Sequence, residues 1–193
     1  MKAYKFNHIN NGFFDGPLVL EPNVYKDKRG AFLESWNMNL FNKITGEINN
    51  FVQDNQSISQ KGVLRGMHFQ IPPFQQGKLI RCTSGAVYDV IVDLRISSKT
   101  FKLWGGIEIN ANNLRQVWIP PGFAHGFLSL EDKTVFEYKV TNYYSSDHEM
   151  SLNWDDKEIK VTWPQIDCTK IISEKDSQAL SFERLSEIKA FFE

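Results

Sequence analysis

Short apolar runs separated by Gly, Pro, Asn and Asp follow one another along the chain from Leu18 to Val140. The runs are four to eight residues long and rich in Val, Ile, Phe, Tyr and Trp. Runs of this length and composition, bounded by turn residues, are typical of β-strands. The pattern predicts strands over residues 18–25, 31–36, 52–57, 63–69, 78–83, 87–94, 103–109, 116–119, 126–130 and 135–140.

Helical periodicity is confined to short stretches. The apolar residues between Asn37 and Ile44 have the spacing of one helix face. Residues 155–192 are predicted to wrap the surface of the strands and to end in a C-terminal helix over residues 177–192. No linker, charge block or repeat interrupts the chain, so we expect residues 1–193 to form a single all-β domain, a sandwich or barrel with its core at about 18–140.

Composition and charge exclude several classes of partner. Of the 193 residues, 22 are Lys or Arg and 23 are Asp or Glu, so the formal net charge is -1 and no broad grip on nucleic acid is expected. Residues 1–10 lack the apolar core of a signal peptide, and no segment approaches the roughly 20 apolar residues of a membrane span. Cys82 and Cys168 follow no metal or redox spacing. We therefore expect a cytoplasmic protein with free thiols and no membrane partner.

Arg65 and His68 lie in or beside one predicted strand. Their odd spacing puts them on opposite faces of a regular strand. Gly66 between them could mark a bulge that turns both side chains toward one cavity. On this pattern alone, His68 is either a hydrogen-bonded core residue or a catalytic group.

Lys78 begins an apolar strand, where it either stays in water or points inward. A buried lysine needs a carboxylate or an anionic ligand to offset the cost of burial. Asp89 and Asp93 share one face of the run at residues 87–94 and are candidate counter-charges, although they could equally form structural ion pairs.

His125 follows a tight turn at residues 119–124. This turn is similar to the P-x-G-x-x-H pattern that often carries a metal ligand in cupins. The companion cupin pattern has a second histidine and a carboxylate, whereas here His68 is followed by Gln70 and no carboxylate is near. Two imidazoles fall short of the usual three protein ligands of a catalytic metal, so no metal is expected.

The polar motifs, taken in their order along the chain, resemble those of the dTDP-4-dehydrorhamnose 3,5-epimerase family, and the resemblance extends over almost the whole chain. The matching segments are DKRG at 27–30 with Glu34, FVQDN at 51–55, VLRGMHFQ at 63–70, QGKL at 76–79, DVIVDLR at 89–95, residues 118–120, GFAHGF at 122–127, residues 138–139, Trp154 and SEKD at 173–176. The resemblance implies a cupin-type jelly roll with a few short helices, which works as a homodimer without metal or cofactor on a dTDP-4-keto-6-deoxy sugar.

The resemblance also implies the chemistry and the catalytic residues. A ketone at C4 acidifies the C–H bonds at C3 and C5, so a base can form an enolate that is reprotonated from the opposite face. By resemblance His68 is the base and Asp176 orients it. Tyr138 would donate from the other face, and Lys78 would ease loss of the tyrosine proton and stabilise the enolate oxygen.

The substrate-binding positions also follow from the resemblance. Arg29, Arg65, His125 and Lys175 are candidates for the diphosphate and its surroundings, and Glu34, Gln53, Asn55 and Glu149 for the thymine edge and the sugar hydroxyls. The chain departs from the family pattern at Trp36, at Gln56 and at residues 72–74. These departures leave open a C3-only or C5-only epimerase. Two further alternatives are a metal-dependent cupin oxygenase, which the turn at His125 favours, and a non-catalytic nucleotide-sugar binder.

Overall fold

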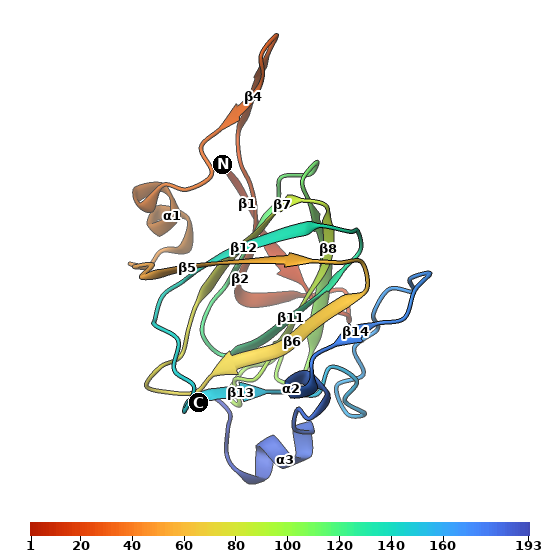
Figure 1. Ribbon diagram of the computed structural model, residues 1–193. Helices are drawn as coiled ribbons and strands as arrows, with labels where there is room; N and C mark the ends of the chain where they lie inside the picture. The colour runs from red at the N-terminus through yellow and green to blue at the C-terminus, as the bar shows by residue number, and fades with distance from the viewer.

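The structure, a computed structural model, describes residues 1–193 and consists of two antiparallel sheets that face each other (Figure 1). The first sheet has the strand order β1 (Lys2–Asn7), β2 (Phe13–Glu21), β10 (Gln116–Ile119), β7 (Lys78–Ser84), β12 (Thr134–Val140) and β5 (Gln53–Ser59). The second has the order β13 (Glu149–Ser151), β6 (Val63–Gln70), β11 (Phe123–Ser129), β8 (Ala86–Asp93) and β9 (Trp104–Asn110), and β14 (Ile171–Ile172) pairs with β6 in parallel. The predicted all-β jelly roll is confirmed.

The hydrophobic core has two layers. Between the sheets, Phe14, Ile80, Ile91 and Phe136 belong to a cluster of 13 buried residues. A second cluster covers the outer face of the second sheet and includes Phe182 from the C-terminal segment. Side chains of this segment therefore bury that outer face. None of the helices has the length and apolar character needed to cross a membrane.

The helix α1 (Met38–Thr45) covers part of the outer face of the first sheet and agrees with the prediction. It begins because the Asn37 side chain accepts a hydrogen bond from the Leu40 N–H, and it ends at Gly46, whose φ of 76° suits a left-handed cap. Phe41 on its inner face is buried against Trp118 of β10.

The predicted single C-terminal helix is wrong. The chain instead forms α2 (Glu174–Ser177), a short extended link, and α3 (Phe182–Glu187). Ser181 caps α3 through the Arg184 N–H, and the buried Asp156 accepts the Phe182 N–H, so the helix has to restart at this point. The final residues leave the helix, and Phe192 exchanges backbone hydrogen bonds with Leu94 and Ile96.

The N-terminal strands also differ from the prediction. The first sheet begins at Lys2, well before residue 18, and the strand expected over residues 18–25 is divided at Glu21 between β2 and β3 (Val24–Asp27). Strand β3 pairs only with β4 (Gly30–Leu33), and this hairpin stands away from the barrel in Figure 1. Its cross-strand pair Tyr25 and Phe32 is 63% and 70% exposed.

Candidate active site

An irregularity in β6 aims Arg65 and His68 in the same direction. His68 lies opposite His125 on β11, whereas Arg65 lies opposite Phe127, so two residues of β6 face only one of β11. This is the bulge that Gly66 predicted, and the extra residue offsets the odd spacing. Gly66 has a φ of +126°, and a Cβ there would lie 2.5 Å from the Gly126 Cα, so only glycine fits.

His68 and Asp176 form a hydrogen-bonded pair. The His68 Nε2 lies 2.5 Å from the Asp176 Oδ1, and Asp176 is held on α2 by a bond between its own N–H and the Ser173 hydroxyl. Burial works to raise the pKa of Asp176, but His68 and Ser173 hold it below its usual value. Because Nε2 is engaged, the Nδ1 atom of His68 is left to exchange protons.

Lys78 points inward, which resolves the alternatives left by the sequence. It is 8% exposed, and its Nζ donates to the His68 carbonyl at 3.2 Å. Burial lowers the pKa of Lys78 to about 8, although the charges of Glu149 and Asp89 oppose this shift. At neutral pH the side chain therefore keeps most of its positive charge inside the site.

Asp89 supplies the buried counter-charge beside Lys78. Its Oδ1 lies 2.6 Å from the His125 Nε2, and both side chains are buried. Burial raises the pKa of Asp89 and lowers that of His125. Asp93, the other candidate, is instead bound by Arg95, Ser98 and Thr100, so its role is structural.

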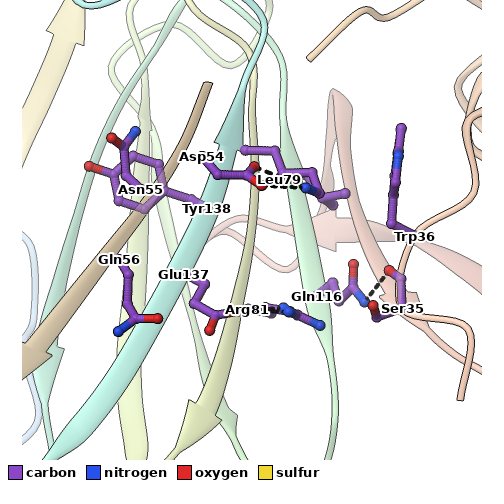
Figure 2. Close-up of a pocket in the computed structure, with 11 residues that line it drawn as sticks. Ser35, Trp36, Asp54, Asn55, Gln56, Leu79, Arg81, Gln116, Glu137 and Tyr138 are labelled. Carbon is purple, nitrogen blue, oxygen red and sulfur yellow. Dashed lines mark hydrogen bonds and ion pairs between the residues drawn. The ribbon is translucent and has the colours of Figure 1, made fainter. Parts of the chain in front are cut away.

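Tyr138 comes from β12 of the first sheet and lies opposite Asn55 of β5 (Figure 2). Burial raises the pKa of its phenol; the positive charge of Arg65 acts in the opposite direction, and the negative charge of Glu149 adds to the rise. Arg65 is therefore a cation close enough to favour ionisation of Tyr138, and the role expected for Lys78 toward this tyrosine stays a prediction.

Glu149 joins the site because β13 pairs with β6, which places Glu149 opposite Gln70. Its Oε2 accepts hydrogen bonds from the Lys175 Nζ at 2.5 Å and from the Tyr144 hydroxyl at 2.7 Å. Burial favours a higher pKa for Glu149, but these two bonds hold it below its ordinary value. Tyr144 was missed from the sequence because an aromatic pair after a strand carries no signal of its own.

Polar side chains of β5 continue the site toward Tyr144. The Gln53 Nε2 donates to the Asn55 Oδ1 at 2.8 Å, and the Gln53 Oε1 accepts from the Tyr144 N–H. The Arg65 Nε donates to the Ser59 hydroxyl at 3.4 Å. This bond connects the end of β5 in the first sheet with β6 in the second sheet.

Arg29 and Glu34 do not reach this cluster within one chain. Arg29 lies at the tip of the β3–β4 hairpin, bonds to Asp27 at 2.6 Å and has an 85% exposed side chain. Glu34 accepts a bond from Asn37 before α1. Figure 1 shows the hairpin at the opposite end of the molecule from α2 and β13.

A cavity of about 360 Å³ lies along the first sheet beside Trp36, and Asn55 and Tyr138 are also among its lining residues (Figure 2). Its charged residues are paired: Arg81 contacts Glu137 at 2.6 Å, and Lys139 contacts Asp54 at 2.8 Å. No group of three or more His, Cys, Asp or Glu side chains is placed to hold a metal ion anywhere in the structure.

Known proteins share both the sequence and the architecture. The model of the family described as dTDP-4-dehydrorhamnose 3,5-epimerase matches residues 13–184. The dTDP-4-dehydrorhamnose 3,5-epimerase of Shigella flexneri is 48% identical over 86% of this chain and 90% of its own. The Legionella pneumophila dTDP-6-deoxy-D-glucose-3,5-epimerase, solved with dTDP-4-keto-L-rhamnose, superposes with a TM-score of 0.89 at 38% identity over 99% of this chain and 98% of its own.

A 3'-monoepimerase of Streptomyces bikiniensis, solved with dTDP-quinovose, also has this fold, with a TM-score of 0.86 at 30% identity over 92% of this chain and 89% of its own. The 3,5-epimerases of Shigella flexneri and Legionella pneumophila are therefore more similar to this chain in sequence identity than the monoepimerase is. The chain belongs to the dTDP-4-dehydrorhamnose 3,5-epimerase family.

Proposed function

We propose that this protein inverts C3 and C5 of dTDP-4-dehydro-6-deoxy-D-glucose to give dTDP-4-dehydro-L-rhamnose, without metal or cofactor. The observation that carries the proposal is the His68–Asp176 pair, which shares its surroundings with the buried Lys78 and with Tyr138. A base, a proton donor and a buried cation are what proton transfer beside a ketone requires.

His68 acts as the base in this proposal. Asp176 accepts the Nε2 proton and fixes the tautomer, so Nδ1 carries the lone pair that takes the proton from carbon. Removal of the proton gives an enolate whose negative charge is concentrated on the C4 oxygen. Lys78 stabilises this oxygen, because a buried ammonium interacts more strongly with developing charge than an exposed one does.

Tyr138 acts as the proton donor on the other face of the sugar. Its raised pKa keeps the phenol protonated at neutral pH, and Arg65 stabilises the phenolate that forms when the proton leaves. Inversion follows because His68 on β6 and Tyr138 on β12 come from the two facing sheets.

The nucleotide lies toward the outer part of the site in this proposal. Arg65 and Lys175 supply positive charge for the diphosphate, and Gln53, Asn55 and Glu149 supply polar contacts. The half-exposed Tyr144 offers a flat surface for a base. His125 is 7% exposed and bonded to Asp89, so we assign it to the sugar end of the site.

We further propose that the protein works as a cytoplasmic homodimer. A two-stranded hairpin with exposed aromatic residues is marginal alone and gains stability by packing on another surface. In a dimer, Arg29 of the partner subunit would reach the nucleotide, which accounts for the position of the hairpin at the opposite end of the molecule from α2 (Figure 1). The unpaired Cys82 and Cys168 fit a reducing compartment.

Proton NMR of dTDP-4-keto-6-deoxyglucose in D₂O with chelator-treated protein tests the proposed reaction. We expect the C3 and C5 hydrogen signals both to disappear without added metal. Loss of only one signal would make the protein a single epimerase, like the Streptomyces bikiniensis relative in its described activity. Exchange only after metal is restored, or no exchange at all, would contradict the proposal.

A further inference from the structure

The inner face of β5 carries a row of polar side chains with one unpaired member. Along this strand exposed residues alternate with more buried ones, and the more buried positions are Gln53, Asn55, Ser57 and Ser59. Gln53 bonds to Asn55, and Ser59 accepts a bond from Arg65. The Ser57 hydroxyl is enclosed by protein and has no hydrogen-bond partner.

The position of Ser57 gives no structural reason for a hydroxyl. Its neighbour across the strands is Phe136 on β12, which is fully buried in the core between the sheets. An apolar side chain would suit this contact, since a buried hydroxyl without a partner is destabilising. The missing partner is therefore expected to come with a ligand.

The neighbours of Ser57 indicate which part of a ligand would supply the missing hydrogen-bond partner. The next inward residue on one side is Asn55, opposite Tyr138, and on the other side it is Ser59, which holds the Nε of Arg65. This bond leaves the terminal nitrogens of Arg65 free to bind an anion. An oxyanion held by Arg65 would therefore lie within the part of the site that Ser57 borders.

We propose that Ser57 is a substrate-binding residue whose hydroxyl donates a hydrogen bond to the diphosphate held by Arg65. This inference rests on the proposed function, because it takes the ligand to be a nucleoside diphosphate sugar. Ser57 then helps to anchor the non-reacting part of the substrate, and His68 and Tyr138 carry out the proton transfers. Loss of the hydroxyl should weaken binding without slowing the chemical steps.

The test compares Ser57→Ala with Ser84→Ala, a matched change at an exposed serine at the end of β7. Calorimetry measures the binding of dTDP and of thymidine, which lacks the diphosphate, and a progress assay gives kcat and KM for the proposed substrate. For Ser57→Ala we expect about tenfold weaker dTDP binding, a similar rise in KM and a kcat within about twofold of the parent, since a hydrogen bond to a charged group is being lost. Thymidine binding should not change, and Ser84→Ala should match the parent in every measurement.

Three results would overturn the inference. Unchanged dTDP binding and KM would show that the hydroxyl does not contact the diphosphate. An equal loss of dTDP and thymidine binding would show that Ser57 acts through the shape of the site, and a fall in kcat alone would place the hydroxyl at the sugar. If the parent protein exchanges the sugar hydrogens but Ser57→Ala binds normally, only the inference on Ser57 fails; if the parent neither binds dTDP nor exchanges them, the proposed function fails as well.

Discussion

Lys78 makes the activity and the stability of the protein respond to pH in opposite directions. Burial lowers its pKa to about 8, so the positive charge that stabilises the enolate is lost as the pH rises through about 8. We therefore expect kcat to fall above this pH. Between about 8 and the ordinary lysine pKa the unfolded chain binds the proton and the folded chain does not, so the contribution of Lys78 to the free energy of unfolding rises with pH.

A pH series of rates and thermal melts for the parent and for Lys78→Met checks this expectation. The variant should lose most of its activity at every pH, and it should also lack the rise in stability above about pH 8. A parent rate that does not change between pH 7 and 9.5 would contradict the role of the charged lysine.

Replacement of His68 and replacement of Tyr138 should impair different steps of the reaction. His68→Ala should slow hydrogen exchange at both carbons by about 10²- to 10⁴-fold, because general base catalysis contributes that much. Tyr138→Phe should still exchange substrate hydrogen with D₂O while failing to complete at least one inversion. NMR measures exchange and product configuration in the same sample, and full turnover by either variant would refute its assigned role.

At the level of elements, the β6 bulge should depend on Gly66. Gly66→Ala brings a Cβ to 2.5 Å from the Gly126 Cα and 2.8 Å from the His125 carbonyl oxygen, in addition to its positive φ. Gly30→Ala is a matched control, since Gly30 has a φ of +127° and nothing within 4 Å of the added Cβ. We expect the control to lose about 1–3 kcal/mol of stability from strain and Gly66→Ala to lose more. Equal losses in denaturant melts would show that β6 can move away from β11.

At the level of elements, the sequence pattern predicted correctly those features that have a signal in neighbouring residues. Gly66 marked the bulge in β6 correctly, because a glycine between two polar residues of a strand is a local signal. The local pattern left the direction of Lys78 open, and only the family resemblance placed it in the site, since its burial depends on elements far apart in sequence. The C-terminal helix was mispredicted because the contact of Asp156 with the Phe182 N–H, which starts α3, joins residues 26 apart.

At the level of the whole molecule, the distance of Arg29 from His68 predicts an active site shared between two subunits. Arg29→Ala should weaken dTDP binding, and His68→Ala should be inactive. When the two variants are co-expressed in equal amounts, half of the dimers are mixed, and each mixed dimer has one site with neither change if Arg29 acts across the interface. About a quarter of the parent activity should then return when the substrate concentration is below KM. No recovery beyond that of Arg29→Ala alone would mean that Arg29 does not complete the partner's site, and the exposed hairpin would need another explanation.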